Sequence, residues 1–266
     1  MYVKFMKVKN SINIFSLKDK LSIVIGGTGK IGRPITEAFL EAGSVVVVCS
    51  KNTKNQKMLM NDYKQYNTLF FEKFDQANPK DIIKLSKIIL KKYGVPNILV
   101  NSSVYRPMKK YLNDSYKKFD ESLLFNGRGL FLINREFANM MKTNKKGSII
   151  NISSIYGVVA PDPSIYENTK INTEPDYPFT KAGTISMTNY FASYYAKHNI
   201  RFNTIIPGGL FNFQNKKFLQ KYIKKVPLGR MAEAKDLKGP ALFLASNASS
   251  YVTGSCIYVD GGYTTL

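Results

Sequence analysis

The sequence contains one glycine-rich segment suited to phosphate binding, VIGGTGKIG at 24–32, between an apolar run and an amphipathic stretch. Glycines in such a turn let the backbone approach a pyrophosphate closely, and the following helix points the positive end of its dipole at that group. Glycines also serve ordinary strand-to-helix turns, so this segment by itself indicates a dinucleotide site without establishing one.

The residues that end the second apolar run, Cys49-Ser50-Lys51-Asn52, bear on which dinucleotide would bind. Folds that prefer NAD usually place a carboxylate here, which accepts a hydrogen bond from the ribose 2′-hydroxyl. No acid stands here, and Ser50, Lys51 and Lys30 could bind a 2′-phosphate instead. The pattern favours NADP(H) and leaves NAD(H) open, because Lys51 is also one of many lysines expected at the surface.

Histidine and cysteine chemistry is excluded by how few of these residues there are. His198 is the only histidine and follows a helical stretch, which argues against a Ser-His pair and a His-ligated metal. Cys49 and Cys256 lie in apolar runs, where thiols are typically inert, buried packing groups of a reducing compartment. We therefore predict no metal site.

Apolar runs alternate with amphipathic stretches, which is typical of a parallel sheet covered by helices on both faces. The predicted strands are 21–26, 44–50, 69–75, 97–101, 148–154, 201–207 and 256–260. The predicted helices are 33–43, 80–93, a long one within 113–142, and two more near 177–198 and 233–246, and the polar segment between 50 and 69 is also compatible with a helix. The fold class is therefore α/β: a Rossmann-type doubly wound sheet of about seven strands, in one domain over 15–266 after an N-terminal extension at 1–14.

The net charge of +21 comes mainly from lysines scattered along the whole chain, because only six of the 39 basic residues are arginine. This distribution indicates solvated faces and predicts no nucleic-acid partner, while it remains compatible with an anionic substrate. No apolar run approaches the roughly 18–20 residues that span a bilayer. The N-terminus lacks the apolar stretch of a secretory signal, so we expect a cytoplasmic protein without a membrane partner.

Several segments, taken together and in this order, resemble the short-chain dehydrogenase/reductase family from about Ser16 to Tyr263. IGGTGKIG is similar to the family's TGxxxGxG turn, NSSV (101–104) occupies the place of its NNAG, and FNGRGLF (125–131) resembles the segment with its helix asparagine. NISS (151–154) holds the family's serine, and YPFTK (177–181) is a YxxxK motif. IRFNTIIPGG (200–209) and the C-terminal VPLGRMAEAKDLKGPALFLAS and YVTGSCIYVDGG resemble its remaining signatures.

The resemblance assigns Tyr177 as the general acid/base and Lys181 as its partner and as a ligand of the nicotinamide ribose. It implies that Ser154 hydrogen-bonds the substrate oxygen and that Asn126 anchors a proton-relaying water. A tyrosine hydroxyl has a reference pKa of about 10. A lysine one helical turn further on, together with the charge of an oxidised nicotinamide, is expected to lower that pKa.

The resemblance also implies a set of cofactor contacts at the ends of the strands. These are Gly26, Thr28, Gly29, Lys30, Ile31, Ser50, Lys51, Asp75, Asn101, Ser102, Tyr177, Lys181, Pro207, Gly208 and Leu210. The sequence departs from the family where Lys30 replaces the second glycine, where Ser102 and Val104 stand in NNAG, and where Asn212 replaces a frequent threonine.

The YxxxK pattern occurs at Tyr105, Tyr166 and Tyr177. Tyr166 lies 12 residues after Ser154, close to the usual family spacing, whereas Tyr177 lies 23 after it. A helix from Tyr166 would have to cross INTEPDYP, where two prolines break it. The helix from Tyr177 runs uninterrupted to the next strand, so we predict that Tyr177 is catalytic and that 160–176 is an insertion beside the active site.

The insertion resembles that of family members in sugar, surface-glycan and flagellin-modification pathways. The first hypothesis is therefore a sugar or nucleotide-sugar oxidoreductase. A 3-oxoacyl-carrier-protein reductase and a non-catalytic NADP-binding regulatory or scaffolding protein remain as alternatives. Family resemblance further predicts a homotetramer or homodimer built from the helices near 113–142 and 177–198 and from the C-terminal strand.

Overall fold

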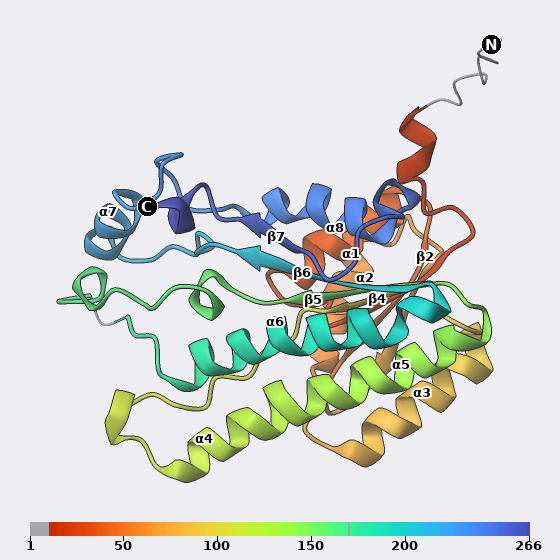
Figure 1. The fold of residues 1–266 in the computed structure, drawn as a ribbon, viewed down its shortest axis with the longest axis horizontal. Helices are drawn as coiled ribbons and strands as arrows, with labels where there is room; N and C mark the ends of the chain where they lie inside the picture. Colours follow the sequence, from red (N-terminus) through yellow and green to blue (C-terminus); the bar gives the residue numbers. More distant parts are fainter. Residues whose placement is uncertain (1–10, 170) are drawn as a thin grey trace.

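The computed structural model describes residues 11–169 and 171–266, and their seven strands form one parallel sheet in the order β3-β2-β1-β4-β5-β6-β7 (Figure 1). The strands are β1 (Leu21–Ile25), β2 (Val45–Ser50), β3 (Leu69–Lys73), β4 (Ile98–Asn101), β5 (Gly147–Ile152), β6 (Ile200–Pro207) and β7 (Cys256–Val259). The strand order reverses between β1 and β4, which is the switch point of a doubly wound fold. The predicted fold class is confirmed.

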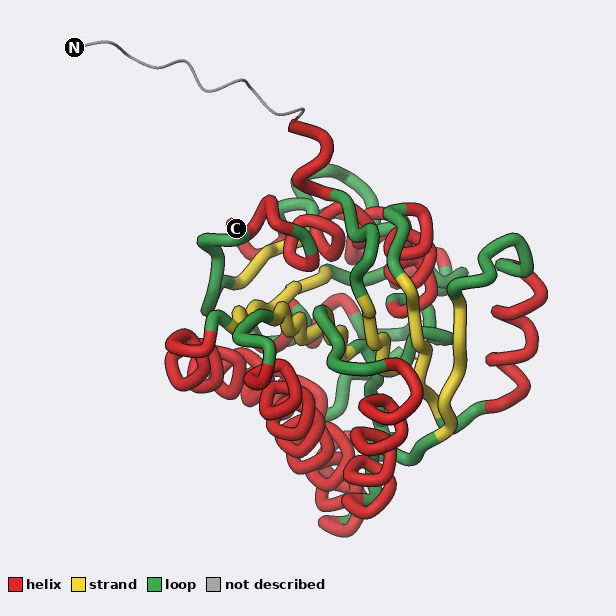
Figure 2. Tube along the Cα trace, turned by 90° about the vertical axis from the view of Figure 1, so that its right-hand side faces the viewer, coloured by secondary structure: helices red, strands yellow, loops and turns green. Residues whose placement is uncertain are grey.

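Helices cover both faces of the sheet (Figures 1 and 2). One layer consists of α1 (Gly32–Glu41), α2 (Thr53–Asp62) and α8 (Lys238–Ala245). The other consists of α3 (Pro79–Tyr93), α4 (Tyr116–Ser122), α5 (Leu130–Thr143) and α6 (Asp176–Tyr195). None of these described helices is long and apolar enough to cross a bilayer.

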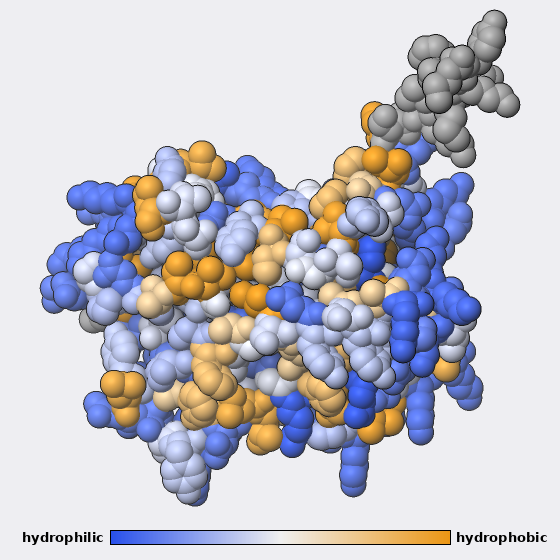
Figure 3. Space-filling model, viewed as in Figure 1, coloured by the Kyte–Doolittle hydropathy of each residue, from blue (hydrophilic) through white to orange (hydrophobic). Residues whose placement is uncertain are grey.

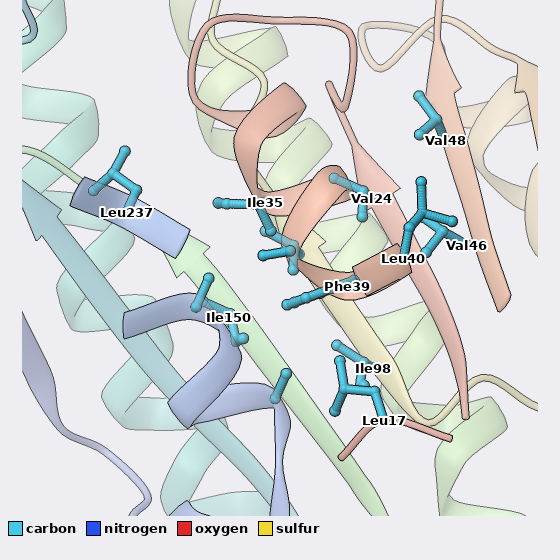
Figure 4. Packing of buried hydrophobic residues seen from close by; sticks show 14 of the residues in the cluster. Leu17, Val24, Ile35, Phe39, Leu40, Val46, Val48, Ile98, Ile150 and Leu237 are labelled. Atoms are coloured by element: carbon cyan, nitrogen blue, oxygen red, sulfur yellow. The ribbon is translucent and has the colours of Figure 1, made fainter. Parts of the chain in front are cut away.

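The two larger apolar clusters of the core lie one on each face of the sheet, because successive strand side chains point to opposite faces, and a third, smaller cluster lies around Ile206 and Tyr222. Val24 of β1 packs with Ile35 and Phe39 of α1 (Figure 4), whereas Ile23 and Ile25 pack in the cluster beneath α3 and α5. Burial on both faces explains why the central strands are continuous apolar runs rather than alternating ones. The edge strands β3 and β7 keep partly exposed residues, and Cys256 of β7 is only partly buried, unlike its predicted environment.

Two features differ from the elements that the sequence predicts. The long helix within 113–142 is interrupted by a π-helical stretch, Leu123–Gly129, which contains Asn126. A further short helix, α7 (Lys216–Ile223), begins after Asn215, whose side chain accepts a hydrogen bond from the Phe218 backbone at 2.8 Å. Eight residues give too little periodicity to identify a helix from sequence.

The predicted N-terminal extension falls only partly within the described residues. Residues 1–10 lie outside them, and Ser11–Phe15 form a 3₁₀ helix that precedes β1. The side chains of Ile12 and Phe15 are exposed. The extent of the extension therefore stays a prediction.

Candidate active site

The predicted site residues gather at one edge of the sheet, because the carboxyl ends of parallel strands all lie there. Gly26 follows β1, Ser50 ends β2, Asp75 follows β3, Ser154 follows β5 and Pro207 ends β6. Six of the predicted residues line one cleft of about 230 Å³: Ile31, Ser154, Tyr177, Pro207, Gly208 and Leu210. Thr28, Gly29 and Lys30 line a neighbouring cavity of about 540 Å³, which shares Leu210 with the cleft.

The glycine turn after β1 brings backbone segments too close together for larger residues. Gly26 has φ +75°, and a Cβ there would lie 2.8 Å from the Ser103 backbone nitrogen. A Cβ on Gly32 would lie 2.3 Å from the Gly26 carbonyl oxygen. The turn thus exposes backbone at the start of α1 and fits the pyrophosphate of a dinucleotide. Lys30 is exposed in the turn, where its ammonium can reach a phosphate.

Lys51 and Asp75, which are predicted as separate cofactor contacts, form an ion pair with each other. The Lys51 ammonium lies 2.6 Å from an Asp75 carboxylate oxygen, and the Lys51 side chain is 74% exposed. This hydrogen bond holds the pKa of Asp75 below its usual value. Ser50 accepts a hydrogen bond from Gln56 at 3.4 Å. A 2′-phosphate at this position would therefore share Lys51 with Asp75.

Asn101 and Ser102 are held by the protein itself. The Asn101 amide donates to the side-chain oxygens of Asn134 and Asn151 at 2.9 and 2.7 Å, and its own oxygen is buried without a partner among the described residues. The Ser102 hydroxyl donates to the Ile25 carbonyl at 2.7 Å. These bonds fix the end of β4 against β1 and β5, beside the glycine turn.

Asn126 is buried in the π-helical stretch and binds the loop that follows β4. Its amide donates to the Tyr105 carbonyl at 2.6 Å and to the Ser122 hydroxyl at 3.0 Å, and its oxygen accepts from the Tyr105 backbone at 3.0 Å. Both amide hydrogens are therefore in use. A water at this position would have to bind the second lone pair of the oxygen or a nearby backbone group.

Ser154, Tyr177 and Lys181 form the centre of the site. Ser154 lies close enough to the Tyr177 hydroxyl to oppose the rise that burial causes in its pKa, and the Ser154 hydroxyl accepts a hydrogen bond from the Tyr156 backbone at 3.2 Å. Lys181 lies one turn further along α6, with its ammonium 5.7 Å from the Tyr177 ring centroid. The ammonium is buried and donates to the Ile152 carbonyl at the end of β5 at 2.8 Å.

The electrostatics of this centre are set by burial and by Arg106. Burial raises the pKa of Tyr177, while the Ser154 hydrogen bond and the charge of Arg106 oppose the rise. Burial, together with Arg106, lowers the pKa of Lys181 to about 8. Among the protein's own groups, the cation that opposes burial at Tyr177 is Arg106, with its guanidinium carbon 4.5 Å from the ring centroid. The effect expected of Lys181 together with an oxidised nicotinamide stays a prediction.

Sequence reasoning missed several residues of the cleft: Arg106, Tyr156, Gln214, Phe218, Tyr222 and Met231. A signal for Arg106 existed, because it is a rare arginine in a lysine-rich chain and follows β4 at the edge where the site forms. Conversely, several predicted residues do not line the cleft: Ser50, Lys51, Asp75, Asn101, Ser102, Asn126 and Lys181.

Segment 160–176 contributes to the cleft through Tyr166, Ile171, Asn172 and Thr173. The Tyr166 hydroxyl donates to the Tyr156 hydroxyl at 2.5 Å and accepts from Thr173 at 2.9 Å. Lys170, the lysine of the competing YxxxK, lies outside the described residues. Within the described residues, no group of three or more histidine, cysteine, aspartate or glutamate side chains could hold a metal ion.

Comparison with known proteins identifies the family to which this chain belongs. A family model described as Enoyl-(Acyl carrier protein) reductase matches residues 27–264. Post-translational flagellin modification protein A of Campylobacter coli is 31% identical over 257 residues, covering 93% of this chain and 99% of that protein. The chain belongs to the short-chain dehydrogenase/reductase family.

Further relatives of this dehydrogenase/reductase support the same assignment. L-rhamnose-1-dehydrogenase of Scheffersomyces stipitis is 30% identical over 258 residues, covering 92% of this chain and 96% of that protein. The structure of a short chain dehydrogenase from Leptospira borgpetersenii with bound NAD+ has a TM-score of 0.88 and 34% identity, covering 99% of both chains. The protein is accordingly an NAD(P)-dependent oxidoreductase that acts on CH–OH or C=O groups.

Proposed function

We propose that this dehydrogenase/reductase interconverts a carbonyl and an alcohol on a sugar or nucleotide-sugar, with Tyr177 moving the proton. One observation carries the proposal: Tyr177 and Ser154 line the same cleft within interaction distance of each other, with Lys181 buried one helical turn away. Ser154 would polarise the substrate oxygen, an electrostatic role worth a few kcal/mol where comparable donors are measured. Tyr177 would then exchange the proton with that oxygen.

The cofactor would lie along the carboxyl edge of the sheet. The close approach at Gly26 and Gly32 forms a cradle for the pyrophosphate, and Lys30 adds a cation beside it. Lys181 would hold the nicotinamide ribose, and the charge of an oxidised nicotinamide would favour the Tyr177 phenolate against the effect of burial. When bound, the nicotinamide supplies or accepts the hydride.

We infer that NADP(H) is preferred to NAD(H). The support is the end of β2, where Ser50 and Lys51 stand in place of a carboxylate, although Asp75 partly neutralises Lys51. Replacing Lys51 with Asp should weaken NADP binding about tenfold or more and change NAD binding much less, because repulsion replaces attraction to the 2′-phosphate. Fluorescence titration with both cofactors measures this, and equal wild-type affinities would contradict the preference.

The sugar substrate is supported by the relatives and by the insertion. The rhamnose dehydrogenase and the flagellin modification protein are both similar over nearly the whole chain. Segment 160–176 forms most of a second cavity of about 990 Å³ that shares Tyr166, Asn172 and Thr173 with the cleft. Its tyrosine and proline walls and its two charged residues, Glu167 and Lys217, suit the far part of an extended polar substrate.

An acyl thioester is the second candidate substrate, because the matching family model carries the description of an acyl-carrier-protein reductase. The basic chain suits an acidic carrier protein, while the bulky insertion beside the cleft argues against it. An absorbance assay at the NADPH band over phosphorylated sugars, nucleotide-sugars and acyl thioesters separates the two candidates. Turnover of acyl thioesters alone would overturn the sugar proposal.

We further propose that the protein assembles as a homodimer or homotetramer. Phe131 of α5 and Tyr190 and Tyr194 of α6 are 39%, 66% and 55% exposed, and hydrophobic side chains gather over these helices (Figure 3). On β7, Tyr258 is 47% exposed. Exposed aromatic side chains on these elements support an interface between copies of the chain. Light scattering at micromolar concentration tests the proposal, and a monomer would contradict it.

A further inference from the structure

Among the described residues that line the cleft with Ser154 and Tyr177, Arg106 is the only one with a formal charge. Its side chain is 36% exposed, and its guanidinium lies over the Tyr177 ring. The other lining residues are apolar or uncharged polar groups. A positive charge in such surroundings acts at short range and with little screening, so it strongly favours an anionic ligand.

The guanidinium is held in place but is not saturated by protein partners. Its Nη2 donates to the Asn172 carbonyl at 3.3 Å and to the buried Glu174 carboxylate at 3.5 Å. Charge-assisted bonds of this type are usually about 2.7–2.9 Å long. Arg135 shows the contrast, because its Nη2 and Nε contact Glu136 at 2.8 and 3.0 Å. Arg106 therefore keeps Nη1 and Nε, among the donors described, for another acceptor.

We propose that Arg106 is a specificity-determining residue that binds an anionic group of the substrate, a carboxylate or a phosphate, close to the carbon that reacts. This inference deepens the proposed function, since it names the substrate class as an acidic sugar derivative rather than a neutral sugar or polyol. The planar fork of arginine matches a carboxylate or phosphate through two parallel hydrogen bonds. Because the guanidinium lies over the ring of Tyr177, the anionic group must be only a few covalent bonds from the atom that Tyr177 serves.

Glu174 orients the Arg106 guanidinium and leaves its cleft side available to a ligand. Its carboxylate is 5% exposed and does not line the cleft, so it contacts Arg106 from behind. Glu174 approaches Arg106 from within the protein, so the cleft side of Arg106 stays open to a ligand.

The test compares ligands that share one carbon chain and differ in charge. Calorimetry of the NADP-loaded enzyme would measure binding of gluconate, glucitol and glucitol 6-phosphate. We expect the wild type to bind one of the two anions at least tenfold more tightly than glucitol, and the better anion identifies the group. Arg106→Gln should remove most of that preference while changing glucitol binding less than twofold, and Arg106→Lys should keep part of it. A wild type without anion preference, or an unchanged preference in Arg106→Gln, overturns the proposal.

Arg135→Gln is the matched control, because Arg135 also pairs with a glutamate and lies over an aromatic ring, 5.5 Å from Phe131, but outside the cleft. It should leave the anion preference intact. Kinetics separate recognition from the effect of Arg106 on Tyr177: recognition raises KM for acids more than for polyols, in addition to any loss of kcat common to both, whereas a role limited to Tyr177 lowers kcat for acids and polyols alike and moves the pH profile with no selective rise in KM. Only the first result supports the proposal. If no sugar reacts, the proposed function fails, while the binding preference still decides the role of Arg106.

Discussion

Two tyrosines of YxxxK motifs face the same cleft, and they belong to very different parts of the molecule. Tyr177 lies in the first turn of α6, a regular helix of 20 residues. Tyr166 lies in the insertion, after the short 3₁₀ helix Pro163–Ile165. Burial raises the pKa of both hydroxyls, so burial does not distinguish them. The residues around each hydroxyl distinguish the two tyrosines.

Tyr177 has the partners that proton transfer needs: Ser154 beside its hydroxyl, Arg106 over its ring and Lys181 one turn away. Tyr166 is bonded to the hydroxyls of Tyr156 and Thr173, and these bonds and the charge of Arg106 also oppose the rise that burial causes in its pKa. What distinguishes Tyr177 is therefore its position beside Ser154 and one helical turn before the buried Lys181. A motif therefore specifies a helix turn and a pair of residue types. The charges that make a tyrosine reactive come from other elements.

The largest effect expected from this difference is that of Tyr177→Phe, which removes the hydroxyl that we propose transfers the proton and keeps the aromatic volume. Turnover should fall roughly 10²–10⁴-fold with little change in cofactor affinity. Tyr166→Phe is the matched substitution in the insertion and should keep most of kcat, with any effect in KM. Steady-state kinetics and cofactor titration measure both, and an inactive Tyr166→Phe beside an active Tyr177→Phe would reverse the assignment.

Lys181→Ala should differ in kind from Tyr177→Phe. It removes the buried ammonium that would hold the cofactor ribose, so turnover and cofactor affinity should fall together. We expect a loss of at least tenfold in each, from single-turnover kinetics and fluorescence titration. If cofactor affinity is unchanged, Lys181 acts only near Tyr177 or on the Ile152 carbonyl.

Gly157→Ala tests how firmly the start of α6 is held. A Cβ on Gly157 would lie 2.7 Å from the Lys181 carbonyl carbon, and the Ser153 hydroxyl already binds the Lys181 carbonyl oxygen at 2.7 Å. Overpacking at such a contact costs about 1–3 kcal/mol. We expect that loss in denaturant unfolding, with lower kcat. Gly183→Ala lies within α6 itself, and a Cβ there would meet nothing within 4 Å, so this substitution should be neutral or slightly stabilising.

The smallest expected effect is a pH dependence of stability from Lys181. Its pKa in the folded protein is about 8, below the usual 10.5, so between these values the unfolded chain binds a proton that the folded chain has released. The free energy of unfolding should therefore rise with pH in this window, by at most about 1.4 kcal/mol per unit. Urea unfolding at pH 8 and 9.5 should show this rise in the wild type relative to Lys181→Met. Parallel curves would mean that Lys181 is less desolvated than the structure shows.

Local sequence patterns determined the order of strands and helices, the glycine turn and the choice of Tyr177, since these depend on residues only a few positions apart. The two prolines after Tyr166 decide that choice without any tertiary contact. Patterns of this kind also place the carboxyl end of every strand at one edge of the sheet, because all strands of a parallel sheet run in the same direction. The π-helical stretch and α7 are too short or too irregular to leave such a pattern.

Tertiary structure alone decided the electrostatics of the site. Arg106 reaches the Tyr177 ring, and its Nη2 bonds Asn172, 66 residues away in sequence, because β4 and the insertion end at the same edge of the sheet. Lys51 is paired with Asp75 for the same reason, since β2 and β3 are neighbouring strands. Burial of Lys181, which lowers its pKa to about 8, depends on the packing of α6 against β5 and on how little water remains there. Charge, distance and solvent exposure act through space, so the chain order of the residues does not reveal them.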